Sequence, residues 1–224
     1  MSTFATIIAV TPPQLPPVLD LGAVALGAVY GATLATSRKA PLIGVLIISV
    51  TMGVGGSIIR DLLLHTDLNV LIHERYMATV MVCTLIGVFL GKWLLQPLWL
   101  ILMLDALVMG AYVVMSTEKS FLFGMPTASS IFIGTVAAIG GGILSDVLLG
   151  NQPDIMSRGP WSASIAFVCA VWFTLFATLG FISFAEISTV VLAVGIKGMA
   201  LWRGWEAPMP EHLYPTEWIR RTRR

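Results

Sequence analysis

The ten residues GGSIIRDLLL at positions 55–64 recur as GGGILSDVLL at positions 140–149. The second copy follows the first by 85 residues, and both lie inside long hydrophobic segments. The same interval relates two further pairs, Asp20 with Asp105 and Pro41 with Pro126. Coincidences at one ungapped interval indicate an internal duplication. Irregular backbone at membrane depth is tolerated only where protein or a water-filled path surrounds it, so the glycines of these phrases predict a special site.

The composition predicts an all-α integral membrane protein. Hydrophobic residues make up 57% of the chain and charged residues only 11%, which excludes an ordinary soluble domain. Apolar stretches of about 20 residues recur, the length that crosses a hydrocarbon core. Seven can be placed, at roughly 17–37, 41–64, 76–96, 98–117, 126–149, 160–182 and 185–204.

The distribution of basic residues predicts the orientation. With seven spans the two ends of the chain lie on opposite sides, and one side receives most of the basic residues: Arg38, Lys39, Lys92, Arg158, Arg203 and the tail. The other side receives Arg75 and Lys119, with Arg60 just inside it. The positive side is cytoplasmic, so the N-terminus is expected outside and the C-terminus inside. Tryptophans fall at the same inner boundary: Trp93, Trp99, Trp161, Trp202 and Trp205.

The spans group into two halves. An N-terminal segment (1–16) precedes a first three-helix repeat (17–96) and a second (97–182). Because each repeat holds an odd number of spans, the second is expected to enter the membrane inverted, as in many transport proteins. A seventh helix (183–204) and a basic tail (205–224) complete the chain.

Several classes of function have no support in the sequence. There is no nucleophile–base pair, phosphate loop or dinucleotide fingerprint, so no enzyme, cofactor or nucleic-acid partner is expected. Cys83 and Cys169 lie within spans and are expected to pack as small apolar groups. The scattered histidines (His65, His73 and His212) predict no metal site. No cleavable signal peptide is expected, because a basic start is lacking and prolines interrupt the stretch before the first span.

The glycine clusters allow two interpretations. They comprise Gly53, Gly55 and Gly56, followed by Ser57, in the second span and Gly140, Gly141 and Gly142 in the fifth. Glycine disfavours a helix by about 1 kcal/mol relative to alanine, so clusters need a reason. Close helix packing is one. Since two clusters occur at equal depth in antiparallel halves, we favour breaks in both helices that line an ion path.

Charges near the two clusters suggest how the path is closed. Arg60 and Asp61 lie within the outer part of the second span, where charges are expensive and usually face the bundle interior. Asp20 opens the first span at similar depth, so we expect an Arg60–Asp20 pair that gates or tunes the outer half. The alternative is that Arg60 reaches the interface.

The second copy differs in its charges. Ser145 replaces Arg60, which leaves Asp105 and Asp146 near the inner end without a cation from their own repeat. Unpaired acids would attract cations into an inner vestibule; alternatively, either acid caps the N-terminus of a neighbouring helix. Lys197 in the seventh span could reach one of these acids, although we favour its extension to the cytoplasmic surface.

These motifs resemble a known group. The paired phrases, each ending 41 residues after a span-opening aspartate, are similar to the two Gly-Gly-Gly-x-x-Arg-Asp repeats of a bacterial membrane family related to the trimeric intracellular cation (TRIC) channels. The resemblance covers residues 17–204 and implies seven helices, a homotrimer with one pore per protomer, and permeation of potassium and, less selectively, sodium. It also implies a prokaryotic inner membrane.

The resemblance carries the family's glycine hinges onto residues 55–57 and 140–142, and its charges onto Arg60, Asp61 and Asp146. Ser57 and Ser145 depart from the pattern, and Ser145 puts a two-sided arginine gate in doubt. We therefore expect a monovalent cation channel, with a secondary transporter of a small solute such as glycine, or a scaffold, as alternatives. The terminal arginines are expected to contact anionic lipid: Arg220, Arg221, Arg223 and Arg224.

Overall fold

The protein folds as a bundle of helices in a computed structural model that describes residues 17–94, 98–156 and 162–204. The long helices are α2 (Pro17–Ser37), α3 (Leu42–Leu63), α5 (Glu74–Leu94), α6 (Leu98–Leu122), α7 (Thr127–Leu148), α8 (Ser162–Thr178) and α9 (Ile182–Arg203). Two short helices lie between them, α4 (Asn69–Ile72) and η1 (Asp154–Met156). The predicted spans therefore correspond to helices, and α6 continues five residues beyond its predicted end.

Five of these helices, α2, α3, α6, α7 and α9, are long and apolar enough to cross a membrane. Helix α8 is apolar but shorter. Large apolar side chains such as Leu42, Phe89 and Ile187 are exposed on the outside of the bundle. An apolar exterior of this kind suits a hydrocarbon environment.

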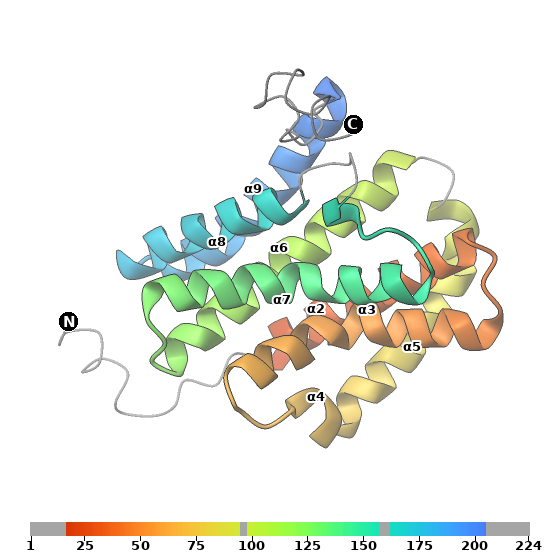
Figure 1. Cartoon of the computed structure of the whole chain (residues 1–224), viewed down its shortest axis with the longest axis horizontal. Helices are drawn as coiled ribbons and strands as arrows, with labels where there is room; N and C mark the ends of the chain where they lie inside the picture. Colours follow the sequence, from red (N-terminus) through yellow and green to blue (C-terminus); the bar gives the residue numbers. More distant parts are fainter. Residues whose placement is uncertain (1–16, 95–97, 157–161, 205–224) are drawn as a thin grey trace, which may run out of the picture.

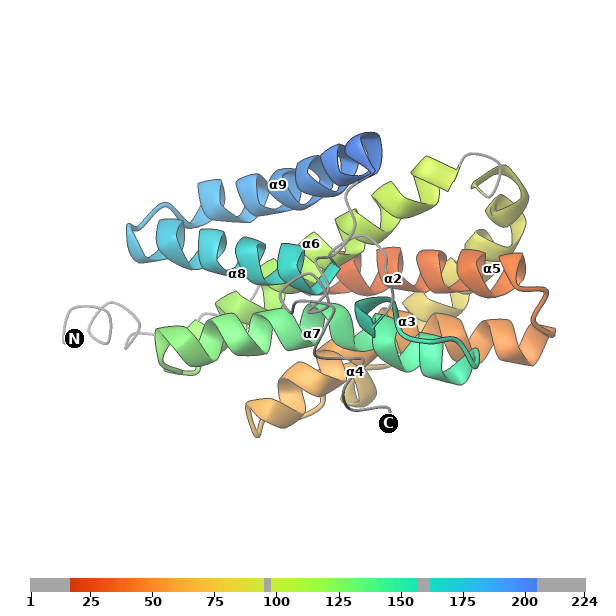
Figure 2. The same ribbon diagram turned by 45° about the horizontal axis from the view of Figure 1, so that its top comes forward.

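The centre of the bundle is the contact between α3 and α7, which lie side by side (Figure 1). Helix α2 packs on α3 and α5, while α6 packs on α7 and α9. Helices α8 and α9 pair at one side of the molecule (Figure 2). Contacts of α2 with α6 join the two groups of helices.

The 85-residue interval recurs in the backbone geometry. Prolines 41 and 126 precede α3 and α7, and each helix has 22 residues. The turns after α2 and α6 place Lys39 and Gly124 in the left-handed region, with φ of 56° and 72°. The turns after α3 and α7 do the same for His65 and Gly150, with φ of 53° and 71°. The two halves therefore share their turns as well as their motifs.

The expected breaks in the second and fifth helices are absent, and that prediction is wrong. Both α3 and α7 run without interruption through their glycine clusters. Glycine weakens a helix but does not by itself break one. Most of these glycines pack against a neighbouring helix, and that packing compensates for their low helix propensity.

Candidate functional site

The glycines of the repeated phrases allow α3 and α7 to approach backbone to backbone. A Cβ atom added to Gly55 would lie 3.2 Å from the Cα atom of Gly141. One added to Gly56 would lie 2.5 Å from the carbonyl oxygen of Ala137. Neither position has room for a methyl group without a backbone shift. The packing role considered for these glycines is therefore present.

The remaining members of the clusters have different surroundings. A Cβ atom on Gly140 would meet only the end of the Ile59 side chain, and one on Gly142 would meet nothing within 4 Å. Ser57 is fully buried within α3. Gly142 lies on a cavity described below. In the second cluster, therefore, Gly141 packs against α3, whereas Gly142 lines the cavity.

One end of the bundle holds a buried group of charges, here called the Arg60 cluster: Asp20, Arg60, Asp61, Tyr76 and Lys119. Arg60 Nη1 lies 3.1 Å from Asp20 Oδ1, so the Arg60–Asp20 pair expected from the sequence forms. Arg60 Nε also donates to Asp61 Oδ1 at 2.7 Å. Arg60 is 1% exposed and therefore does not extend to the surface.

Two further residues complete the cluster. Lys119 Nζ donates to the same Asp61 Oδ1 at 2.8 Å, and the Tyr76 hydroxyl donates to Asp20 Oδ2 at 2.8 Å. The cluster draws on α2, α3, α5 and α6, and its two carboxylates balance its two cations. Buried charges require this kind of pairing and hydrogen bonding to offset their desolvation. The sequence had assigned Lys119 to a loop because the helix was expected to end at residue 117.

A tyrosine separates the Arg60 cluster from the rest of the interior. Tyr112 of α6 is 2% exposed, and its hydroxyl donates a hydrogen bond to the carbonyl oxygen of Gly53 near the middle of α3. Its ring packs over Gly56, where an added Cβ atom would lie 3.1 Å from Cδ1 of the ring. Tyr112 therefore fills the interior at the level of the glycine crossing. No feature of the repeat predicted it, because the equivalent position is Gly27.

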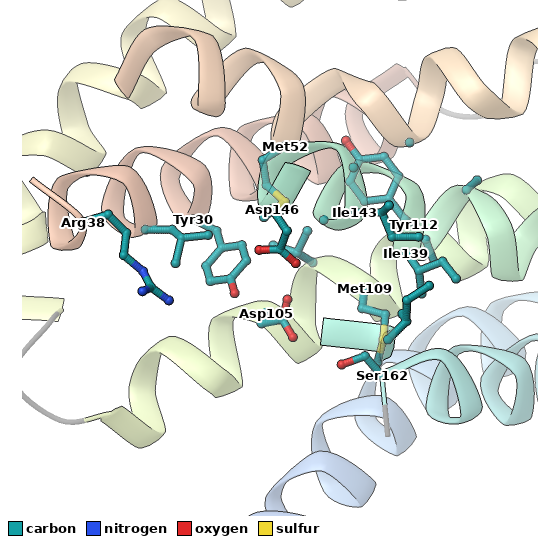
Figure 3. A pocket seen from close by; sticks show the side chains of 18 residues that line it. Tyr30, Arg38, Met52, Asp105, Met109, Tyr112, Ile139, Ile143, Asp146 and Ser162 are labelled. Atoms are coloured by element: carbon teal, nitrogen blue, oxygen red, sulfur yellow. The ribbon is translucent and has the colours of Figure 1, made fainter. Parts of the chain in front are cut away.

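Below Tyr112 lies a cavity of about 110 Å³, here called the Asp105 cavity. This volume is several times the roughly 10–15 Å³ needed for the centre of one water molecule. Its walls come from α2, α3, α6 and α7, and Ser162 at the start of α8 completes them. Figure 3 shows the side chains of Tyr30, Asp105 and Asp146 directed toward one another, with Arg38 farther out. The cavity is therefore lined by polar side chains toward Arg38 and is bounded by Tyr112 at its opposite, deeper end.

The two charged regions lie at opposite ends of α2. Asp20 is in its first turn, and Arg38 follows its last residue. A helix rises about 1.5 Å per residue, so these positions are about 27 Å apart along the axis. This distance is close to the roughly 30 Å thickness of a hydrocarbon core. The repeated aspartates are split in the same way, with Asp20 and Asp61 at one end and Asp105 and Asp146 at the other.

Lys197 corrects two expectations for the second half. Its Nζ donates to Asp105 Oδ2 and, at 3.0 Å, to Ser162 Oγ, and the residue is fully buried. Asp105 is therefore paired, by a cation from α9 rather than from its own repeat, and Lys197 does not extend to the surface. Asp105 is the eighth residue of α6, and the alternative that it caps a neighbouring helix stays a prediction.

Ser145 occupies the position that corresponds to Arg60 and is also fully buried. Its hydroxyl approaches the sulfur of Met52 at 3.9 Å. No guanidinium is therefore present where the second half would carry one, and the next residue, Asp146, lines the Asp105 cavity. The sequence predicts that the two copies differ in charge. In the structure, buried ion pairs occupy the end with the Arg60 cluster, whereas the other end contains the Asp105 cavity.

Other predicted residues are placed as follows. Cys169 is fully buried in the apolar core, Cys83 is half-buried, and both are free thiols. His65 and His73 are exposed. Several predicted positions lie outside the described residues: Arg158, Trp161, Trp205, His212 and the four terminal arginines.

Comparisons with known proteins agree with the duplication. A family model described as "Glycine transporter" matches residues 17–92 and 102–178, two stretches whose starts are again 85 residues apart. Together these stretches cover well over half of the chain. The chain belongs to this family. Its halves correspond to α2–α5 and α6–α8, and α9 lies outside both matches.

Relatives of this family include membrane proteins of several bacteria. The chain is 28% identical to a "UPF0126 membrane protein" of Deinococcus radiodurans over 69% of this chain and 74% of that protein. It is 29% identical to the "UPF0126 inner membrane protein YadS" of Escherichia coli over 62% of this chain and 68% of that protein. The names of these relatives and the apolar helices of the bundle support a multi-pass protein of the inner membrane.

Solved structures with the same fold are cation channels. A TRIC trimeric intracellular cation channel orthologue from Rhodobacter sphaeroides is 26% identical, with a TM-score of 0.74 over 84% of this chain and 98% of that one. A structure described under "Structural basis for conductance through TRIC cation channels" is 23% identical, with a TM-score of 0.75 over 87% of this chain and 97% of that one. The resemblance to TRIC channels is thus confirmed, and the fold supports a cation channel.

Proposed function

We propose that the protein is a monovalent cation channel that prefers potassium, admits sodium, and conducts through a separate path in each protomer of a homotrimer. The observation that carries this proposal is the line of polar groups inside the bundle. It begins at the Arg60 cluster, passes Tyr112 at the glycine crossing and continues into the Asp105 cavity. Such a line has no role in an apolar scaffold, because buried polar groups are expensive in a membrane.

The charge of the cavity supports a cation rather than an anion as the permeant ion. Asp105 and Asp146 both contribute to its wall, and Arg38 lies farther out. Carboxylates in a cleft with low-dielectric walls raise the local concentration of cations. No resident cofactor or metal is required by this proposal; potassium and sodium are the cargo.

We place the gate at the Arg60 cluster. In this structure paired charges from α2, α3 and α6 lie buried in the interior at this end of the bundle. Conduction then requires the Arg60 side chain to leave Asp20 or the helices to separate. Unchanged conductance and open probability in Arg60→Ala and in the charge-balanced Arg60→Met/Asp20→Asn variant would exclude this role.

The arrangement in the membrane follows from the same proposal. All seven long helices span the inner membrane as two inverted three-helix repeats and a seventh helix, with the N-terminus outside. Two structural neighbours are TRIC channels, and one of them is described as trimeric, which supports a homotrimer here. The terminal arginines would contact anionic lipid headgroups on the cytoplasmic side.

Recording from purified protein in planar bilayers tests the function directly. We expect unitary current steps whose reversal potential follows the potassium gradient and not the chloride gradient. Sodium should carry current at a lower level. Current that follows chloride, or no current from protein that is folded and correctly inserted, would refute the channel.

A secondary transporter of glycine is the second candidate, because the matching family model carries that description. A transporter should saturate with its substrate and couple to an ion gradient, whereas a channel should not. Uptake of labelled glycine into liposomes, with and without a sodium or proton gradient, separates the two. Saturable uptake in protein that gives no unitary currents would reverse the ranking.

A further inference from the structure

Lys197 supplies to the second half the positive charge that its own repeat lacks. In the first half, Asp20 is paired with Arg60 from the same repeat. In the second half, Ser145 replaces that arginine, and the equivalent aspartate, Asp105, is paired with Lys197 of α9. The positively charged side chain of the second half therefore comes from a helix outside both repeats and not from α7.

This change of source alters the position of the positive charge relative to the cavity. The Lys197 side chain is 1% exposed, while that of Asp105 is 24% exposed. The ammonium group is therefore covered by protein on one side of the carboxylate, and the carboxylate faces the cavity on the other. A carboxylate that binds one ammonium group still has free acceptor sites on its oxygens. An ion in the cavity can approach Asp105 without displacing Lys197.

The ammonium group is held in place by two oxygen atoms. It contacts one carboxylate oxygen and one hydroxyl oxygen, from Asp105 and Ser162. Both residues belong to the wall of the cavity. Lys197 thus places a fixed positive charge directly beside the cavity.

Resting on the proposed function, we propose that Lys197 sets the affinity of the Asp105 cavity for cations. It is a tethered counter-cation that offsets the charge of Asp105 and so limits the affinity of the cavity for permeant monovalent cations. A cavity without this offset would hold its cations longer and at higher occupancy. Lys197 then balances the negative charge of Asp105, just as Arg60 balances that of Asp20 at the other end of the bundle.

The test compares four full-length proteins: wild type, Lys197→Met, Lys197→Arg and Lys197→Met/Asp105→Asn. Single-channel conductance is measured at low and at high potassium chloride. Removal of the positive charge should raise low-salt conductance at least about threefold, because a charged cleft concentrates counter-ions by tenfold or more. The ratio should approach one at about 1 M salt, where the screening length is only about 3 Å.

The controls separate charge from structure. Lys197→Arg keeps the charge and should resemble wild type, and the double variant removes both charges and should return toward wild type. A merely structural role would not produce a salt-dependent ratio that the double variant reverses. Equal low-salt conductance in Lys197→Met and Lys197→Arg would overturn the proposal.

A second measurement does not depend on conduction. Thermal unfolding of each purified protein is compared in potassium chloride and in choline chloride at equal ionic strength. Potassium should raise the unfolding temperature of Lys197→Met selectively, since the unbalanced carboxylate gains a counter-ion, and should not do so for the double variant. The absence of this potassium-specific shift would refute the inference even if wild type conducts. Its presence in protein that never conducts would refute only the channel.

Discussion

Replacement of Arg60 by methionine should be among the most destabilising single changes in this chain. The substitution removes the contacts of 3.1 Å to Asp20 and 2.7 Å to Asp61 and leaves a buried net negative charge. Within the described structure Asp20 then keeps the Tyr76 hydroxyl, and Asp61 keeps Lys119. Removing one partner of a buried ion pair typically costs about 3–5 kcal/mol, because the remaining charge is uncompensated.

The loss should be recovered in part by a second change. In Arg60→Met/Asp20→Asn the cluster again has equal numbers of positive and negative groups, with Asp61 paired to Lys119. The double variant should therefore be more stable than the sum of the single variants predicts. Contacting charged groups commonly show coupling of about 0.5–3 kcal/mol, and we expect the upper part of that range here.

Thermal unfolding in detergent, followed by the accessibility of the buried thiol of Cys169, measures these effects. For a chain of this size 1 kcal/mol corresponds to roughly 2–4 °C, so Arg60→Met should lower the midpoint by about 6–20 °C. Arg38→Met is the matched control, because Arg38 is exposed and its loss should change stability by no more than about 0.5 kcal/mol. Similar midpoints for the two variants, or a coupling energy near zero, would show that the Arg60 cluster is hydrated and that its ion pairs do not hold the helices together.

Three further predictions concern the interior. Gly56→Ala should destabilise the protein by about 1–3 kcal/mol, because its Cβ atom would lie 2.5 Å from the Ala137 carbonyl oxygen. Gly142→Ala should be neutral or slightly stabilising, because its Cβ atom would meet nothing within 4 Å. Denaturant unfolding of the two variants measures this difference, and the reverse order of stability would contradict the packing argument. Tyr112→Phe removes the hydrogen bond to Gly53 and should cost about 0.5–1.5 kcal/mol in the same assay, and an increase in stability would show that the buried hydroxyl is a net liability. A maleimide should label the half-buried Cys83 well before the fully buried Cys169 in native protein, and equal rates would indicate that α8 opens readily.

The helices and their grouping could be predicted because hydrophobic length determines spans in a membrane and because the duplication links distant parts of the chain. The Arg60–Asp20 pair followed from depth alone, since both residues lie near the same end of adjacent spans. The role of the glycines could not be decided in this way. A kink and a close helix contact require the same residue type, and only the distance from Gly56 to Ala137 of another helix distinguishes them.

The residues whose contacts the sequence did not decide have one property in common. Lys119 corresponds to Leu34 in the first half, Tyr112 corresponds to Gly27, and Lys197 belongs to α9, which neither half contains. None of them is duplicated, so the comparison of the two copies carried no information about them. They are also the residues that make the two ends of the interior different: Lys119 completes the balance of the Arg60 cluster, Tyr112 separates it from the cavity, and Lys197 balances the cavity. In this protein the repeat accounts for the arrangement of the helices and for the paired aspartates. The residues that are not duplicated make one end of the interior different from the other. A sequence search for polar side chains within the predicted spans whose repeat equivalents are apolar or absent would have found Tyr112 and Lys197, whereas Lys119 lies beyond the predicted end of its span at residue 117.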